Sequence, residues 1–374
     1  MTRKILAVGV LAAAIAAPDA FARQDRQGQD GPRSGAQTLA IIGDIPYGPD
    51  LIAEFPADIA QINADPDVRR VVHLGDIKDG SSRCDTTYFQ ARLNDFQTFA
   101  DPLVYTPGDN EWTDCHRANN GGYLPTERLA TIRRMFFPKP GETLGKDEAE
   151  VRFQSRAFPE NVSWRSGGVQ FGTVHVVGSN DDQAPWFGTR VDPATGAPKP
   201  ETTEETALRG REYTAREAAA LDWIDGIFDD AEKRDAAGVV IGMQADMWDG
   251  AASDQTAFIA IKAVLADRAA KFGKPVLLLE GDSHLFKVDT PTGQPANLTR
   301  VVVVGLDERP ARVAEAEGRS VLAEGVLVRE RRLPQRRGNA LPGAARAVTA
   351  TPALSGRTLG AGARSPTPSD RPSR

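Results

Sequence analysis

The sequence predicts an α/β fold that contains two sheets. Five short apolar runs rich in Val, Ile and Leu are bounded by Gly or Pro, a pattern typical of strands buried on both faces. Helical patterns separate these runs, so we expect a largely parallel sheet with helices covering both of its faces. Two further runs flank Gly167 and Gly168 and predict a hairpin. Together with one later strand, the hairpin is expected to form a second sheet that packs on the first.

Each expected element has its own local signal. The parallel strands are expected at residues 39–43, 71–75, 103–106, 239–242 and 276–279. The helices are expected at residues 56–64, 86–100, 214–234 and 253–272. The clearest helix has apolar residues at spacings of three and four: Ala218, Leu221, Ile224, Ile227 and Phe228. The hairpin is expected at residues 163–165 and 169–177, and the later strand at residues 299–304. Two polar insertions that contain prolines lie at residues 119–159 and 185–209, and we interpret them as surface lids.

The N-terminal residues have the pattern of a secretory signal. Arg3 and Lys4 precede an apolar run at residues 5–17, and residues 20–22 read Ala-Phe-Ala, which places small residues where a signal peptidase cleaves. We therefore expect a signal peptide at residues 1–22 and a flexible polar lead-in at residues 23–37. The alternative is a membrane anchor, although this run is shorter than the ~20 residues that span a bilayer. The mature protein is expected to be secreted or periplasmic, with no membrane segment after cleavage.

The chain has two cysteines, Cys84 and Cys115, and each follows a Gly-Asp sequence. An oxidising compartment favours a disulfide between them. Such a bond would tie two loops together and contribute about 3 to 4 kcal/mol on the chain-entropy estimate. The alternative is a pair of free, buried thiols.

The C-terminal residues 311–374 differ in composition from the rest of the chain. Residues 331–374 hold nine arginines, one acid and no aromatic residue, so we expect a largely disordered tail after a folded domain at residues 38–310. A basic arm for anionic surfaces and an altered reading frame are the alternatives. Nine arginines against one acid give about +8, so the rest of a chain whose net charge is −6 carries about −14. This acidic body argues against nucleic-acid binding by the core.

Acidic side chains follow four of the expected strands. Ligands of an open α/β sheet bind at the carboxyl ends of its strands, and the polar residues at these ends are Asp44, Asp76, Asp109, Gln244, Asp282 and His284. Clustered carboxylates raise one another's pKa values, and a bound hard cation relieves that repulsion. A single Gly-Asp after a strand is commonly a turn or a helix cap, but four such acids at successive strand ends predict a metal site.

These motifs resemble the calcineurin-like metallophosphoesterase superfamily. The chain reads Asp44, then Gly75-Asp76-Ile77-Lys78-Asp79, Gly108-Asp109-Asn110-Glu111, Gln244, and Gly281-Asp282-Ser283-His284. The family pattern is Asp-x-His, Gly-Asp-x-x-Asp, Gly-Asn-His-Asp/Glu, a lone His, and Gly-His-x-His. The resemblance runs from about residue 39 to residue 304 and implies a four-layer α-β-β-α sandwich in which two mixed sheets are flanked by helices.

The chain departs from the family pattern mainly at histidines. Pro46, Asn110, Gln244 and Asp282 stand where the family has histidine, and Asp109 stands where it has asparagine. The resemblance implies one metal held by Asp44, Asp76 and His284 and a second held by Asp76, Asp109, Gln244 and Asp282. Because most of these ligands are oxygens, one or two ions of Mn, Mg or Ca are expected, with Fe or Zn as alternatives.

The resemblance implies a metal-dependent phosphoric ester hydrolase, a phosphatase or phosphodiesterase, acting on a small-molecule phosphoester. The candidate catalytic residues are Asn110, in place of the catalytic histidine, His116 as a proton donor, and Arg117 as a phosphate contact; His116 could equally be an exposed loop imidazole. His73 and His175 alternate within apolar runs and are expected in the core. The lost histidines leave a second hypothesis open: a catalytically degenerate relative that serves as a secreted metal-binding or ligand-binding module. The substrate and the oligomeric state do not follow from the sequence.

Overall fold

The computed structural model describes residues 38–303 and the backbone of three further strands at residues 320–323, 326–332 and 346–352. The predicted signal peptide (1–22), the lead-in (23–37) and residues 304–310 of the predicted domain lie outside the described residues. Among the described residues, no helix combines the length and the apolar character needed to cross a membrane.

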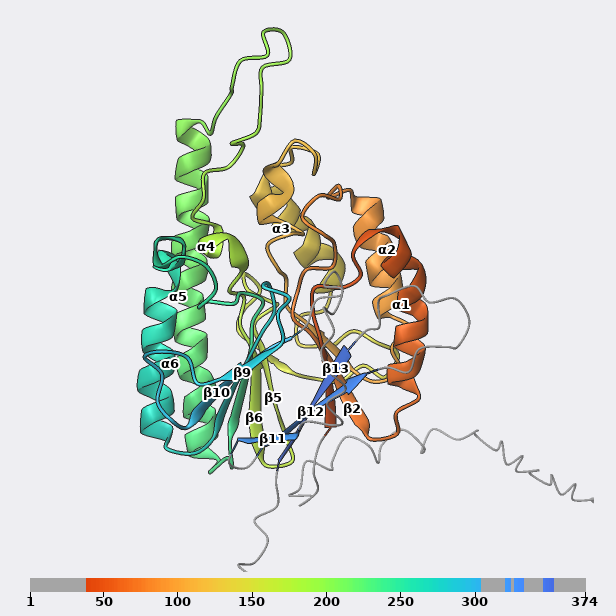
Figure 1. The fold of residues 1–374 in the computed structure, drawn as a ribbon, viewed down its shortest axis with the longest axis vertical. Coiled ribbons are helices and arrows are strands. Elements are labelled where there is room, and N and C mark those ends of the chain that lie inside the picture. The colour runs from red at the N-terminus through yellow and green to blue at the C-terminus, as the bar shows by residue number, and fades with distance from the viewer. Residues whose placement is uncertain (1–37, 304–319, 324–325, 333–345, 353–374) are drawn as a thin grey trace, which may run out of the picture.

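The described residues form two sheets between two layers of helices (Figure 1). The first sheet has the order β11-β12-β13-β1-β2-β3. Its strands are β1 (Thr38–Ile42), β2 (Val68–His73), β3 (Leu103–Tyr105), β11 (Ser320–Ala323), β12 (Val326–Arg332) and β13 (Arg346–Pro352). The second sheet has the order β4-β5-β6-β7-β8-β10-β9. Its strands are β4 (Arg152–Phe153), β5 (Val162–Ser166), β6 (Val169–Thr173), β7 (Val239–Gly242), β8 (Val276–Glu280), β9 (Lys287–Asp289) and β10 (Leu298–Val302).

Helices cover the outer face of each sheet (Figure 1). Those over the first sheet are α1 (Gly48–Asn63), α2 (Thr86–Phe96) and α3 (Pro125–Phe136). Those over the second sheet are α5 (Thr203–Lys233) and α6 (Ile259–Phe272). The short α4 (Gly178–Asp182) and the 3-10 helices η1 (Thr113–His116) and η2 (Ala252–Phe258) belong to the connecting loops.

Three hydrophobic cores separate the four layers. Alternate residues of β1 point to opposite faces, so Ala40 and Ile42 pack with α1, α2 and α3 while Leu39 and Ile41 pack in the core between the two sheets. In the same way, Ile241 of β7 packs against α5 and α6. The predicted α/β sandwich, with two mixed sheets flanked by helices, is confirmed.

The strands that carry the predicted site are parallel to one another within each sheet. β1 pairs with β2 and β2 with β3 in the first sheet, and β7 pairs with β8 in the second, all in parallel. Their carboxyl ends therefore open into loops on one side of the molecule, the upper side in Figure 1. All five strands lie within a few residues of their predicted positions.

Helix starts were predicted less accurately than strand ends. α1 begins at Gly48 rather than residue 56, and Pro56 lies inside it. α5 begins at Thr203, eleven residues before the prediction, because Thr202 and Glu205 form a capping box at its N-terminus. The first half of α5 is polar, and it supports the insertion at residues 185–202, which projects from the body in Figure 1.

Two other segments differ from the expectation. Residues 119–159 are not only a surface lid, because α3 lies within them and buries Leu129, Ile132 and Phe136. β11, β12 and β13 lie within residues 311–374, where the composition predicts a largely disordered tail; strands were not expected there, and the prediction for the tail as a whole stays a prediction. β13 pairs antiparallel with β1 and continues the first sheet past it, which satisfies the backbone groups on that side of β1.

Candidate metal centre

Loops after five strands bring the predicted site residues together. Asp44, Asp76, Asp109, Gln244 and Asp282 each follow a strand by two to four residues. Backbone hydrogen bonds join neighbouring loops: the Asp44 amide donates to the Gly75 carbonyl (3.0 Å) and the Gly281 amide to the Gln244 carbonyl (2.9 Å). The clustering predicted from the sequence is therefore present in the fold.

Three carboxylates form the centre of the site. Asp76, Asp109 and Asp282, called here the three-aspartate cluster, each place one oxygen within 4.8 Å of the others. The Gln244 Nε2 group donates to all three, at 3.2 Å from Asp76, 3.3 Å from Asp109 and 3.1 Å from Asp282. Its Oε1 accepts from the Gly178 amide at 2.6 Å. Gln244 thus presents a donor, not a ligand oxygen, to the cluster.

A second group of side chains adjoins Asp76. His284 Nε2 lies 3.3 Å from Asp44 Oδ1. The hydroxyl of Tyr47 lies 3.4 Å from Asp44 Oδ1, 3.1 Å from Asp76 Oδ2 and 3.5 Å from His284 Nε2. Tyr47 was not predicted as a site residue. The available signal was its position three residues after Asp44, in the same short loop between β1 and α1.

Close packing at two glycines holds the carboxylates in place. A Cβ atom at Gly108 would lie 2.1 Å from Asp76 Oδ1, and one at Gly178 would lie 2.5 Å from Asp282 Oδ1. Both distances are far below any real contact, so these carboxylates are fitted against bare backbone. Any larger residue at either position would displace a site carboxylate.

The backbone of the site is held in the left-handed region. Asp44, Asp76, Asp282 and His284 have φ values of 55°, 57°, 71° and 62°. Aspartate enters this region more readily than most residues, but each instance still costs free energy. Strained residues of this kind persist where the surrounding contacts fix them, and they concentrate at functional sites.

Burial is the main electrostatic feature of the cluster. Removal from water raises the pKa values of Asp44, Asp76 and Asp282 above the usual range. For Asp76 and Asp282, the neighbouring carboxylate of Asp109 is the next largest cause. A cation between these groups would compensate their charge in the ionised form.

The donor set fits a hard cation. Among residues 38–303, the neutral groups that donate to the three-aspartate cluster include Gln244, Asn110 and the Ser179 hydroxyl, which lies 2.6 Å from Asp109 Oδ2. The buried Lys78 ammonium donates instead to the carbonyls of Asp79 and Asn110, at 2.7 and 2.8 Å. Buried carboxylate oxygens that converge from three loops suit a divalent ion.

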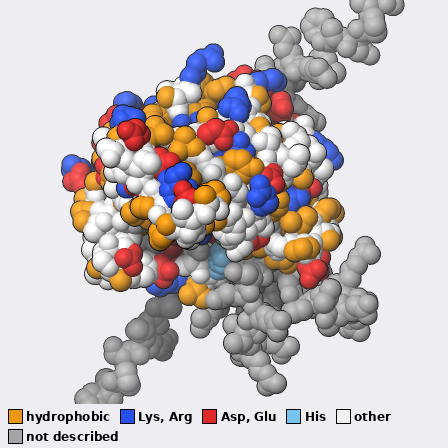
Figure 2. Space-filling model, turned by 90° about the horizontal axis from the view of Figure 1, so that it is seen from above, with side chains coloured by type: hydrophobic (Ala, Val, Ile, Leu, Met, Phe, Trp, Pro, Cys, Tyr) orange, Lys and Arg blue, Asp and Glu red, His pale blue; other side chains and the backbone are white. Residues whose placement is uncertain are grey.

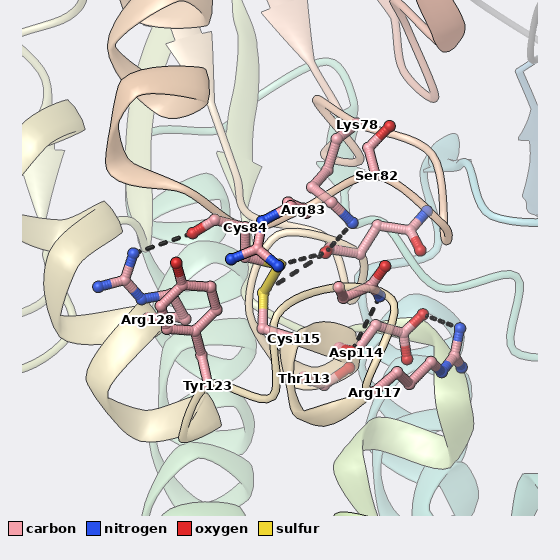
Figure 3. The surroundings of a disulfide bond; sticks show 12 residues. Lys78, Ser82, Arg83, Cys84, Thr113, Asp114, Cys115, Arg117, Tyr123 and Arg128 are labelled. Carbon is pink, nitrogen blue, oxygen red and sulfur yellow. Dashed lines mark hydrogen bonds and ion pairs between the residues drawn. A yellow bond between two sulfur atoms is a disulfide. The ribbon is translucent and has the colours of Figure 1, made fainter. Parts of the chain in front are cut away.

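The three predicted catalytic residues lie on the loop after β3. Asn110 donates through Nδ2 to Asp76 Oδ2 (2.7 Å) and through its amide to Asp76 Oδ1 (3.0 Å). Arg117 is partly exposed and pairs with Asp114 at 2.5 Å (Figure 3). Burial raises the pKa of Asp114 to about 8. Asn110 therefore contacts the cluster, and Arg117 has part of its guanidinium open to solvent.

His116 contacts a different part of the molecule. Its Nδ1 accepts from the Phe187 amide at 2.9 Å, and the two rings meet edge to face. Burial, followed by the charge of Arg117, lowers the pKa of His116 to about 4. The imidazole is therefore neutral near pH 7, and its role as a proton donor stays a prediction.

A disulfide joins the loop after β3, which carries these residues, to the loop after β2. Cys84 and Cys115 are bonded, with their Cα atoms 5.7 Å apart, which confirms the predicted pairing. Their sulfurs lie 3.7 and 3.8 Å from the Asn110 carbonyl oxygen, beside the Lys78 ammonium (Figure 3). Both sulfurs of the bond therefore pack against the carbonyl group of Asn110.

The remaining histidines are core residues, as predicted. His73 and His175 are fully buried. His73 Nε2 lies 3.0 Å from the Ile45 carbonyl oxygen, and His175 Nδ1 lies 2.8 Å from Glu160.

On the face seen from above in Figure 2, basic and acidic side chains are interspersed with hydrophobic ones.

Comparisons with known proteins give only distant likenesses. No protein-family model matches the sequence, and no curated protein matches it. Similar solved structures include GAP50, the anchor in the inner membrane complex of Plasmodium (9% identity, TM-score 0.40, covering 72% of each chain). They also include the purple acid phosphatase PPD1 from yellow lupin seeds (14% identity, TM-score 0.46, 80% of this chain and 52% of that one). A third is Vacuolar Protein Sorting 29 from Cryptosporidium parvum (13% identity, TM-score 0.31, 85% of this chain and 100% of that one). At TM-scores below 0.5, neither a family nor an activity follows from these likenesses.

Proposed function

We propose that the protein is a metal-dependent phosphoester hydrolase. The observation that carries the proposal is the three-aspartate cluster, in which three carboxylates from three loops meet within 4.8 Å. Asp76, Asp109 and Asp282 hold one divalent cation, and Asp44, Asp76 and His284 hold a second. Oxygen ligands favour Mn, Mg or Ca. A bound divalent cation lowers the pKa of a coordinated water and offsets charge on a phosphoryl oxygen.

The chain's own residues orient the substrate. Asn110 Nδ2 donates to Asp76 at 2.7 Å and to the Tyr47 hydroxyl at 3.3 Å, and it would exchange the longer of these bonds for a phosphoryl oxygen. Arg117 is held by Asp114 through one side of its guanidinium, so its remaining N–H groups are available to a second phosphoryl oxygen. Ser179 holds Asp109 in place through its 2.6 Å hydrogen bond. A small phosphoester that reaches the cluster is the proposed substrate.

A degenerate binding module is the second candidate, and one observation favours it. Asp76 Oδ2 already accepts from Tyr47, Asn110 and Gln244, at 3.1, 2.7 and 3.2 Å. These neutral donors stabilise a site without a cation, which a protein that had lost catalysis would require. Such a protein would keep the fold and bind one ion or a small anion without hydrolysing it.

Metal analysis and hydrolysis assays separate the two candidates. Chelator-treated protein is reconstituted with Mn²⁺ or Mg²⁺, its metal content is measured, and a chromogenic phosphomonoester and phosphodiester are supplied. We expect metal-dependent hydrolysis that falls at least about 100-fold in Asp76→Asn, because removal of a shared ligand costs no less than removal of an outer-shell partner. Asp58→Asn is the control, since Asp58 is also buried but lies on α1. Full activity in Asp76→Asn would overturn the mechanism, and metal binding without hydrolysis would favour the binding module.

A further inference from the structure

The insertion at residues 185–202 contacts the loop that carries Arg117. We propose that its first part, residues 186–190, called here the base of the insertion, positions Arg117 and gives the site a preference for phosphomonoesters over phosphodiesters. The inference rests on the proposed function, in which Arg117 contacts a phosphoryl oxygen, and it names the class of phosphoester that the site takes.

Both chain neighbours of Arg117 are hydrogen-bonded to the base of the insertion. On one side, the Phe187 amide donates to His116 Nδ1 at 2.9 Å. On the other side, the Ala118 amide donates to the Thr189 hydroxyl at 3.2 Å. Each contact joins residues that are 71 positions apart in the chain. The place of Arg117 therefore depends on the insertion as well as on its own loop.

Phe187 is held in a strained conformation by its contacts. Its φ is 61°, in the left-handed region, which a bulky side chain rarely enters. The residue is 4% exposed, and its ring meets the His116 imidazole edge to face and lies 4.0 Å from the guanidinium carbon of Arg190. Arg190 makes two hydrogen bonds of 2.9 Å to the Glu205 carboxylate in the first turn of α5. Strain of this kind persists where several contacts oppose it, and it concentrates at functional sites.

Trp186 anchors the base of the insertion to the turn at α4. The side chain is fully buried, and its indole N–H donates to Asp182 at 2.8 Å. Ser179 of the same turn donates to Asp109 at 2.6 Å. The base of the insertion thus connects the turn that holds a carboxylate of the three-aspartate cluster with the loop that carries Arg117.

Arg117 and Asn110 flank one bare position of the backbone. A Cβ atom at Gly80 would lie 3.1 Å from Asn110 Oδ1 and 3.5 Å from Arg117 Nη1. The Arg117 side chain is 38% exposed and pairs with Asp114, which leaves N–H groups open to a ligand. The proposed function gives one phosphoryl oxygen to Asn110 and another to the cation. Contact with Arg117 then uses a third non-bridging oxygen, which a phosphomonoester has and a phosphodiester lacks.

Ligands that are not turned over test this preference independently of activity. Inorganic phosphate has the charge and the free oxygens of a monoester, and dimethyl phosphate has those of a diester. Each is titrated by calorimetry into full-length protein loaded with Mg²⁺. We expect Arg117→Gln to weaken phosphate binding at least about tenfold and Phe187→Ala about fivefold, because a charge-assisted hydrogen bond is lost or misplaced. Dimethyl phosphate and Mg²⁺ should bind both variants as they bind the wild type.

The double variant shows whether Phe187 acts through Arg117. If it does, Phe187→Ala combined with Arg117→Gln binds phosphate no more weakly than Arg117→Gln alone. Thr189→Val is a milder second variant, which removes the acceptor of the Ala118 amide and should weaken phosphate binding about threefold. Thr195→Val is its matched control, because the Thr195 hydroxyl also accepts from a backbone amide, at 3.3 Å, but lies on the exposed part of the insertion. It should bind phosphate like the wild type.

The outcomes separate this inference from the proposed function. Losses that multiply in the double variant, equal losses for phosphate and dimethyl phosphate, or no phosphate binding by the wild type would overturn the inference. Metal-dependent hydrolysis of both chromogenic esters with equal efficiency, unaffected by Phe187→Ala, would also overturn it and leave the hydrolase standing. The expected phosphate affinities in a protein that hydrolyses neither ester would support the inference and overturn the hydrolase.

Discussion

The side-chain amide of Gln244 donates hydrogen bonds to all three carboxylates of the three-aspartate cluster. These hydrogen bonds limit the repulsion between the carboxylates when no cation is bound. Each of the three hydrogen bonds is 3.1 to 3.3 Å long, and the opposite end of the amide is held by Gly178. Gln244 is also fully buried, so water cannot replace these bonds without rearrangement. The residue therefore stabilises the same cluster that a cation would stabilise.

Replacing Gln244 by Glu should make folding depend on metal. The change removes the shared donor and adds a fourth acid, so we expect the chelated variant to lose roughly 2 kcal/mol or more of unfolding free energy. Saturating Mn²⁺ should restore most of that loss, because an ion that binds only the folded state stabilises it. The measurement is urea unfolding with chelator and with Mn²⁺.

Gln170→Glu is the control for that experiment. Gln170 is buried near the start of β6, and its Nε2 group donates to the carbonyls of Trp164 and Phe171 rather than to a site carboxylate. The Gln170→Glu variant should lose stability to a similar degree, and Mn²⁺ should restore none of that loss. Equal behaviour of the two variants toward Mn²⁺ would contradict a metal-binding role for the cluster.

A pH dependence is expected from Asp58, which lies outside the site. Burial, followed by the charge of Glu54, raises the pKa of Asp58 to about 7. Between about pH 4 and pH 7 the folded state therefore binds more protons than the unfolded state, and the unfolding free energy falls as the pH rises. Asp58→Asn removes this dependence, so it should be more stable than the wild type at pH 8 and equally stable at pH 4. The measurement is the unfolding free energy of both proteins in denaturant at pH 4 and pH 8. Asp50→Asn, at an exposed position of the same helix, is the control and should gain no stability at pH 8.

The site residues that follow strands could be predicted from the sequence, whereas those that reach the site from other contexts could not. Asp44, Asp76 and Asp109 follow apolar strands by two to four residues, and the parallel packing of these strands determines where their loops meet. Tyr47 reaches the site from the start of a helix, and Ser179 from a left-handed turn, and no periodic pattern marks either position. Their roles depend on contacts between segments far apart in the chain, such as that of Ser179 with Asp109.

At the scale of elements, the turn at α4 is the most strained segment that contacts the site. Ser179, Asn180, Asp181 and Asp182 all have φ between 53° and 67°. A left-handed conformation costs roughly 1 to 2 kcal/mol for each such residue, so neighbouring contacts must hold the turn. Arg216 of α5 makes the principal contacts with the turn. It is fully buried, pairs with the Asp181 carboxylate and donates to the Asp181 carbonyl at 2.9 Å.

Arg216→Met should destabilise both the fold and the site. It leaves the buried Asp181 carboxylate without its partner, which costs about 3 to 5 kcal/mol, and it frees the turn that places Ser179 against Asp109. We expect a lower urea midpoint and weaker Mn²⁺ binding by calorimetry. Arg268→Met is the matched change on α6, where the arginine pairs with half-exposed acids, and it should cost about 1 kcal/mol or less. Similar costs for the two variants would show that the turn does not depend on Arg216.

At the scale of the whole molecule, the order of strands in the first sheet was only partly predictable. The apolar runs identified β1, β2 and β3, but they also predicted that β7 and β8 belong to the same parallel sheet, whereas β7 and β8 lie in the second sheet beside the hairpin strand β6. The other side of β1 was not predicted, because β13 comes from a segment rich in Arg, Ala and Thr whose composition does not indicate a core. Main-chain hydrogen bonds can recruit such a strand without large apolar side chains, since the edge of a sheet offers unpaired N–H and C=O groups to any extended chain.

Removing β13 should therefore expose the edge of β1. β1 is buried from Leu39 to Ile42 and leads within two residues to Asp44, and β13 pairs with it through Ala40 and Ile41. A chain that ends at residue 345 is expected to lose about 1 to 3 kcal/mol of unfolding free energy, by the net value of a few hydrogen bonds, and to associate through the exposed edge. Urea unfolding and light scattering measure the two effects. A chain that ends at residue 352 keeps β13 and is expected to match the full-length protein. If the two truncated chains behave alike, β13 does not protect β1. The loop that carries Asp44 is then held by β2 alone.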